Sequence, residues 1–297
     1  MFRNTLAQGA RQFVAQGFSF VLAPIMIARL GLTLFGVWAV VGAIATYATV
    51  LDAGITRALA RFIALYDTRD DPRAIRECMG LGFCAFTAIG VVMLPVSWFA
   101  GPPLADALGH VSGIQMSQIL VAMTVIFTVQ GYNAVLQALG QGLRLMVPAN
   151  VAGIIGNVVN FAASVGALFA SHSLVPYAWA NAAAEAASAL IMLVSVRWVW
   201  RTHLVALPSR ARVREVLGFS LQSQVGWIAD LINQQSDKIV IGLLVGARAA
   251  GTYQLGASVA IAVREVGVIA ISAMIPTATA SITSVGREVI GRLTQHY

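Results

Sequence analysis

The chain has 297 residues, of which 58% are hydrophobic and only 10% are charged, and its net charge is +7. Soluble domains carry about 25% charged residues, so this composition excludes a water-soluble domain and predicts an all-α integral membrane protein. The basic residues are spread in short segments between apolar runs, which argues against a nucleic acid as a partner.

In chain order, eight apolar segments are long enough to cross a bilayer, which takes about 20 residues in a helix. We predict membrane-spanning helices at about 5–29, 34–63, 75–100, 113–139, 146–170, 176–200, 216–245 and 250–281. The segments between them are polar or rich in glycine and proline, such as 67–72 and 101–112. No soluble domain fits between the predicted helices.

The distribution of Arg and Lys predicts the orientation of these helices. With the N-terminus in the cytoplasm, 15 of the 19 basic residues fall on the cytoplasmic side and only Arg29 and Arg248 fall on the outer side. Lys238 and Arg264 lie within predicted spans. Because loops rich in Arg and Lys stay in the cytoplasm, we expect a multi-pass protein with a cytoplasmic N-terminus.

Residue types that form catalytic and metal sites are few and dispersed. Cys78 and Cys84 lie six residues apart on one predicted helix, and the four His residues are scattered. We therefore predict no disulfide, no metal site and no catalytic residue, and we do not expect an enzyme.

Residues 30–38 resemble residues 245–253 at a constant offset of 215, with two glycines and one aromatic residue in common. A chance match among the 27 glycines is the alternative, but we favour a parallel repeat of six-helix units, a common architecture in transporters. Residues 1–205 would then form a six-helix transmembrane bundle, and residues 206–297 the first two helices of an incomplete second bundle. We expect a fragment or the product of a truncated gene, inactive by itself.

Two predicted helices, the first and the seventh, carry polar side chains along one face. The candidate cavity residues are Arg11 and Gln16 on the first helix and Asp230, Gln234, Asp237 and Lys238 on the seventh. Polar groups are costly in lipid and face the bundle interior or a water-filled cavity. Because the repeat relates these two helices, we predict a hydrated cleft between the halves. Hydrogen bonding between helices is the alternative for the amides.

Further ionisable residues lie within other predicted spans, namely Asp52 in the second and Arg264 and Glu265 in the eighth. Arg264 lies near mid-membrane, where a cation suits an anionic substrate such as a phosphate-bearing lipid headgroup. An internal salt bridge is the alternative role for Arg264. The fifth and sixth spans carry asparagines and Glu185, which we interpret mainly as packing groups, with Glu185 as a weaker site candidate.

Several short motifs resemble one family through their order and spacing. They are Pro24–Gly31, Phe35–Trp38, Leu51–Ile55, Arg61–Ala64, Leu217–Leu221, Gln235–Gly242 and Gly251–Tyr253. Together they resemble the Wzx-type polysaccharide biosynthesis flippases of the multidrug/oligosaccharidyl-lipid/polysaccharide exporter superfamily. The resemblance implies a MATE-like fold, in which two six-helix bundles enclose a central cavity lined by helices 1, 2, 7 and 8. Members of that family have more spans than the eight predicted here.

The resemblance also implies a function. The substrate would be an undecaprenyl-pyrophosphate-linked oligosaccharide, flipped across the bacterial inner membrane by alternating access. No cofactor is implied other than a coupling ion, H⁺ or Na⁺. The implied partners are membrane lipids and the polysaccharide polymerase and ligase machinery. The match favours Asp52, Asp237, Lys238 and Arg264 as cavity residues without fixing their roles.

Three alternative functions remain open from the sequence. A cation-coupled multidrug antiporter of the same superfamily would have a more aromatic and acidic cavity, and Lys238 and Arg264 argue against it. A membrane-embedded enzyme acting on lipid-linked sugars would need a cluster of acids or His at a membrane face, or a large outer loop, and the sequence predicts neither. The third alternative is a non-functional remnant.

Overall fold

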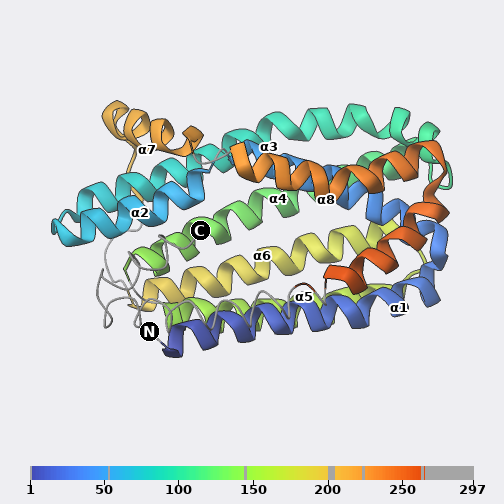
Figure 1. Ribbon diagram of the computed structural model, residues 1–297, viewed down its shortest axis with the longest axis horizontal. Coiled ribbons are helices and arrows are strands. Elements are labelled where there is room, and N and C mark those ends of the chain that lie inside the picture. The colour runs from blue at the N-terminus through green and yellow to red at the C-terminus, as the bar shows by residue number, and fades with distance from the viewer. Residues whose placement is uncertain are drawn as a thin grey trace, which may run out of the picture.

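The computed structural model describes residues 2–52, 54–143, 146–199, 205–222, 225–261 and Arg264, and every regular element in these ranges is helical. The predicted all-α fold is therefore confirmed. The long helices run side by side along one axis of the molecule (Figure 1).

The first helix, α1 (Phe2–Tyr47), contains two of the predicted spans. It reverses at Gly31, so that a first leg of residues 2–30 is followed by a second leg of residues 32–47 that runs back along the bundle (Figure 1). Gly31 has a φ of 84°, in a region that glycine adopts readily because it has no β-carbon. The reversal falls between the first two predicted spans.

The prediction of a single helix at 34–63 is wrong. After α1 ends, a 3₁₀ turn (η1, Ala48–Asp52) intervenes before α2 (Ile55–Thr68) begins. One oxygen of Asp52 accepts hydrogen bonds from the backbone N–H and the hydroxyl of Thr56, both at 3.2 Å. The first N–H groups of a helix have no partner within it, so this carboxylate stabilises the start of a new helix inside the apolar run.

The prediction of a loop at 101–112 is wrong for residues 101–108, because α3 (Pro72–Leu108) continues through Pro102, and only residues 109–112 connect it to the next helix. Proline has no N–H to donate to the carbonyl four residues earlier, which here belongs to Trp98. The hydroxyl of Ser117 on the next helix donates to that carbonyl at 2.7 Å. Side-chain hydroxyls of this kind let membrane helices tolerate proline, so α3 is longer than the Gly-Pro-Pro sequence indicates.

Three predicted spans are confirmed as single helices with similar boundaries: α4 (Gly113–Gly142), α5 (Met146–Ala170) and α6 (Leu174–Val199). The start of α4 has a reciprocal capping box, in which Ser112 and Gln115 bond each other's backbone N–H groups. Within the bundle, α4 packs against α3 and α6, and α5 packs against α6 and α1.

The predicted span 216–245 covers the end of α7 (Arg210–Gln222) and all of α8 (Val225–Leu244), and residues 223 and 224 between them lie outside the described residues. α7 lies beside α2 at one end of the bundle, whereas α8 runs along the bundle (Figure 1). The apolar side chain of Val216 is buried in the same core cluster as residues of α2, so it docks α7 on α2. Residues 247–261 form a further helix. The remainder of the predicted span 250–281, apart from Arg264, lies outside the described residues.

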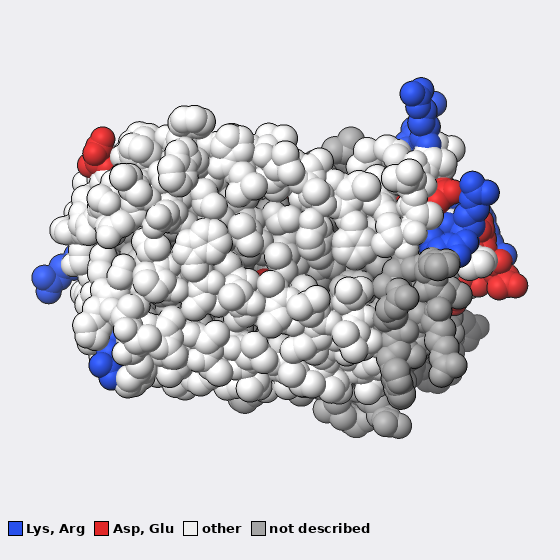
Figure 2. Space-filling view, turned by 180° about the vertical axis from the view of Figure 1, so that it is seen from behind, with Lys and Arg blue, Asp and Glu red and all other residues white. Residues whose placement is uncertain are grey.

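Five described segments are long and apolar enough to cross a membrane: Val14–Val50, Pro72–Leu108, Gly113–Gly142, Val147–Ala170 and Leu174–Val196. The first contains parts of both legs of α1. On the face shown in Figure 2, charged side chains gather at the two ends and the broad band between them is almost uncharged. This surface is typical of a multi-pass membrane protein. The end where α2, α3 and α7 meet is here named the basic end; its described arginines include Arg69, Arg73, Arg76, Arg210, Arg212 and Arg214.

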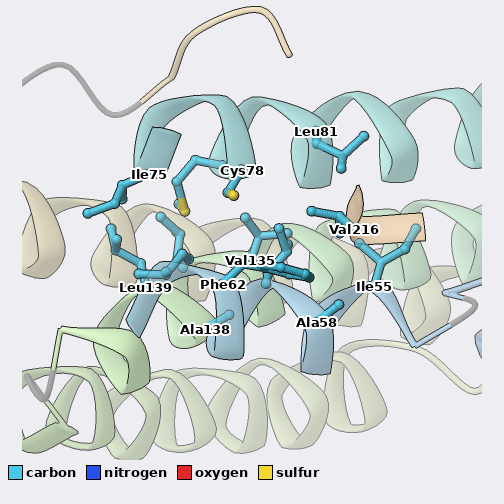
Figure 3. Packing of buried hydrophobic residues seen from close by; sticks show 14 of the residues in the cluster. Ile55, Ala58, Phe62, Ile75, Cys78, Leu81, Val135, Ala138, Leu139 and Val216 are labelled. Carbon is cyan, nitrogen blue, oxygen red and sulfur yellow. The ribbon is translucent and has the colours of Figure 1, made fainter. Parts of the chain in front are cut away.

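Two clusters of buried side chains hold the helices together. The cluster at the basic end joins α2, α3, α4 and α7, and Figure 3 shows Phe62, Cys78 and Val135 packed within it. The second cluster includes Val40 of the second leg of α1, residues of α4 and α6, and Ala250. It therefore joins the first predicted unit to the helix over residues 247–261.

Candidate functional site

The polar face predicted on the seventh span lies on α8, and its members have different surroundings. Asp237 is exposed, and its carboxylate accepts a hydrogen bond of 2.6 Å from the hydroxyl of Tyr253. Lys238 is buried, and its ammonium donates to the side chain of Gln235 at 2.9 Å. Gln234 is exposed one turn before Asp237. Asp237 and Lys238, although adjacent in sequence, therefore bond to different partners.

α8 packs against the second leg of α1. The hydroxyls of Tyr47 and Ser236 lie 2.7 Å apart and form a hydrogen bond. A β-carbon on Gly242 would lie 2.3 Å from a methyl group of Val40, so the two helices approach closely there. Lys238 lies one helical turn before Gly242, and residues at that spacing share a face. The buried Lys238 is therefore on the side of α8 that meets the first predicted unit.

The two segments that the predicted repeat relates, residues 30–38 and 245–253, are in contact with each other. Gly31 and Gly246 occupy matched positions and have φ values of 84° and 113°. Five residues further on, a β-carbon on Gly36 would lie 2.9 Å from the backbone nitrogen of Gly251 and 1.7 Å from the carbonyl oxygen of Ala247. Small residues let membrane helices approach to backbone distance. The matched glycines thus form the contact between the second leg of α1 and the helix over 247–261.

The other predicted site residues are distributed over the structure. Gln16 is half-buried on the first leg of α1, and Asp52 is half-buried in η1, bonded to Thr56. Arg264 is exposed. Three candidates cannot be placed in full: the side chains of Arg11 and Asp230, and the whole of Glu265, lie outside the described residues.

The structure contains a polar cavity that the sequence did not identify. It has a volume of about 430 Å³ and lies between the first leg of α1 and helices α4, α5 and α6. Its polar lining consists of Ser19, Gln130, Asn133, Gln137, Asn157, Asn160, Glu185 and Ser188. A second cavity of about 380 Å³ extends toward the second leg of α1 and shares Gln130, Asn160 and Glu185. These side chains come from four helices, and only tertiary packing brings them together.

At the basic end, charged and polar groups attach α7 to α2 and α3. The buried carboxylate of Glu77 accepts a hydrogen bond from Ser209 at 2.9 Å and lies 3.6 Å from Nε of Arg212. Arg212 also pairs with Glu215 at 2.8 Å and donates to the hydroxyl of Tyr66. That hydroxyl donates to Glu215 at 2.7 Å. Burial and the hydrogen bond to Glu215 raise the pKa of Tyr66 to about 12, so Tyr66 stays protonated at neutral pH.

Comparison with protein-family models matches residues 1–281 to the family described as polysaccharide biosynthesis protein. No curated protein and no solved structure matches the chain. The family match covers the predicted first bundle at residues 1–205, α8 and the helix over 247–261. It therefore includes both the glycine contact and the polar face of α8. From this match over nearly the whole sequence, we conclude that the chain belongs to the polysaccharide biosynthesis protein family.

Proposed function

We propose that this protein moves a lipid-linked oligosaccharide across the bacterial inner membrane by alternating access, without changing the substrate chemically. Family membership supports a role in polysaccharide export. The observation that carries the proposal is the contact of the repeat-related segments at Gly36 and Gly251. Repeated units that meet in this way can rock against each other around a central site, which is how many transporters alternate access.

The substrate that we infer is an undecaprenyl-pyrophosphate-linked oligosaccharide, and the coupling ion is H⁺ or Na⁺. The exposed amide of Gln234 and carboxylate of Asp237 provide acceptors and donors for sugar hydroxyls. Arg264 is exposed in the predicted eighth span, and a guanidinium binds phosphate oxygens through two parallel hydrogen bonds. In this proposal the N-terminus and the basic end face the cytoplasm, and membrane lipids, the polymerase and the ligase are the partners.

Arg264→Ala should lower export of polysaccharide in a bacterial strain that lacks its own flippase and carries the gene for this protein. Hydrogen bonds to charged groups contribute about 1.5–3 kcal/mol, so losing them should weaken pyrophosphate binding roughly tenfold or more. The measurement is the amount of surface polysaccharide at equal protein level in the membrane.

Arg248→Ala is the matched control, because Arg248 is an exposed arginine on the helix over 247–261 and is predicted at the outer side. We expect this variant to export normally. Equal export by the Arg264→Ala variant and the unmodified protein would remove Arg264 from the substrate site.

A further inference from the structure

Residues 205–209, here named the strap, run past α3 and lead into α7. The backbone N–H of Ala206 donates to the carbonyl oxygen of Arg76 at 3.1 Å. A β-carbon on Gly80 would lie 1.9 Å from the carbonyl oxygen of Ala206, so the strap and α3 are in backbone contact there. The uncharged run of α3 begins at Cys78. Because charged side chains are costly in the hydrocarbon core, the strap lies at the boundary between that core and the lipid headgroups.

The strap presents apolar side chains at this boundary. Leu207 is 87% exposed and Val205 is 51% exposed, and Leu207 has the largest exposed fraction among the large hydrophobic side chains that the structure describes. Exposure of a whole leucine to water is unfavourable, whereas apolar side chains at a membrane surface insert between the headgroups and the acyl chains. The strap therefore has the side chains of an interfacial membrane contact.

Arginines flank the strap on the side away from the hydrocarbon core. Arg73 and Arg76 lie seven and four residues before Gly80 on α3, which places them on the face that contacts the strap. They lie about 10 and 6 Å further out along the helix axis. Arg210 is exposed and follows the strap directly. A guanidinium at this depth reaches the lipid phosphate groups, which it binds through two parallel hydrogen bonds.

Two of the arginines next to the strap have no acidic partner. Buried Glu77 pairs with Arg73 at 3.4 Å and with Arg212 at 3.6 Å. Arg76 and Arg210 form no salt bridge with any residue that the structure describes. The other described carboxylates of this end lie at the turn between α2 and α3 or on α7, and they are Asp67, Asp70, Asp71 and Glu215. Two cations next to the strap are therefore available to an anionic ligand.

We propose that the strap binds anionic phospholipids of the adjacent leaflet. Leu207 inserts among the acyl chains, and Arg76 and Arg210 bind the lipid phosphate groups. A zwitterionic lipid carries the same phosphate together with a cationic group that these arginines repel, so the site prefers lipids with a net negative charge. The lipid contact holds the strap and the start of α7 at a fixed depth. This proposal rests on the membrane-embedded fold and does not depend on the proposed transport function.

The test places a fluorescent probe on the strap. Leu207→Cys is labelled with bimane in full-length protein in which the exposed Cys84 is replaced by Ser, while the buried Cys78 is retained. The protein is reconstituted in phosphatidylcholine vesicles in which a small fraction of the lipid carries a quenching nitroxide on its acyl chain. This lipid has either a phosphatidylglycerol or a phosphatidylcholine headgroup. Each arginine near the surface strengthens binding of anionic lipid roughly fivefold, so we expect the phosphatidylglycerol form to quench more strongly.

Val92→Cys provides the matched probe position, because Val92 is 64% exposed in the middle of the uncharged run of α3. Both lipids should quench this probe equally. With the probe on the strap, Arg76→Gln combined with Arg210→Gln should abolish the preference for phosphatidylglycerol. Arg76→Lys combined with Arg210→Lys retains both charges and should retain the preference. Thermal unfolding in detergent shows that each variant is folded.

Equal quenching of the strap probe by both lipids would overturn the proposal. Absence of quenching by either lipid would also overturn it, because the strap would then lie in water, as would a preference that persists in the double Gln variant. Loss of the preference on adding inorganic phosphate at constant ionic strength would show that the arginines bind a soluble anion instead. The vesicles contain no oligosaccharide, so failure of this test leaves the proposed function standing, and failure of transport leaves the lipid contact standing.

Discussion

Gly36→Ala should destabilise the protein and sharply reduce export. The new β-carbon would lie 1.7 Å from the carbonyl oxygen of Ala247, which is part of the backbone and has no rotamer to change. Overpacking typically costs about 1–3 kcal/mol, and this contact should fall at the upper end because a whole helix must move. The measurements are thermal unfolding in detergent and surface polysaccharide in the complementation strain.

Gly42→Ala is the matched control, because Gly42 lies on the same leg of α1 and its β-carbon would meet nothing within 4 Å. Alanine favours a helix over glycine by up to about 1 kcal/mol, so this variant should be as stable as the unmodified protein or slightly more stable. If Gly36→Ala and Gly42→Ala unfolded at the same temperature and exported equally well, the close contact at Gly36 would be contradicted.

Arg212→Ala should weaken the attachment of α7 to α2 and α3. The substitution removes one ion-pair partner of the buried Glu77 and the cation next to Tyr66. Breaking a buried ion pair by removing one partner costs about 3–5 kcal/mol. Here Arg73 and Ser209 still contact Glu77. We therefore expect the free energy of unfolding to fall by a smaller amount, about 1–3 kcal/mol. The loss should appear as a lower unfolding temperature in detergent.

A double-mutant cycle measures the interaction energy between Arg212 and Glu77. In an Arg212→Ala background, the additional change Glu77→Gln should cost less than it does alone, because the partner of the carboxylate is already absent. Arg214→Ala removes an exposed arginine from the same helix and should change stability by less than about 0.5 kcal/mol. Additive effects of Glu77→Gln and Arg212→Ala would show that the two side chains act independently.

The sequence predicted the spans that have no polar interruption, and it failed where a local contact decides the helix boundary. Apolar length and flanking loops were sufficient for α4, α5 and α6. The break before α2 occurs where Gly54 has a φ of 73° and the carboxylate of Asp52 bonds Thr56, and α3 continues where a hydroxyl from another helix bonds the carbonyl of Trp98. Hydropathy measures only whether a run is apolar, so it joined two helices at 34–63 and ended α3 early.

The candidate site was predictable only where the spacing of residues along the sequence places its side chains together. The polar face of α8 and the matched glycines follow from spacing along the sequence. The cavity around Glu185 does not, because Asn133, Asn160 and Glu185 lie on three helices and each resembles a packing group by itself. Their meeting is a consequence of how α4, α5 and α6 pack.

The central claim is translocation of a lipid-linked oligosaccharide, and its most direct test uses purified full-length protein in liposomes. A fluorescent polyprenyl-pyrophosphate-linked oligosaccharide is placed in both leaflets, and an added enzyme that cannot cross the membrane cleaves the sugar from the outer leaflet. We predict that the inner-leaflet fraction becomes cleavable with this protein, in the presence of an H⁺ or Na⁺ gradient, and stays protected in empty liposomes. Equal protection with folded protein and in empty liposomes would contradict the proposed function.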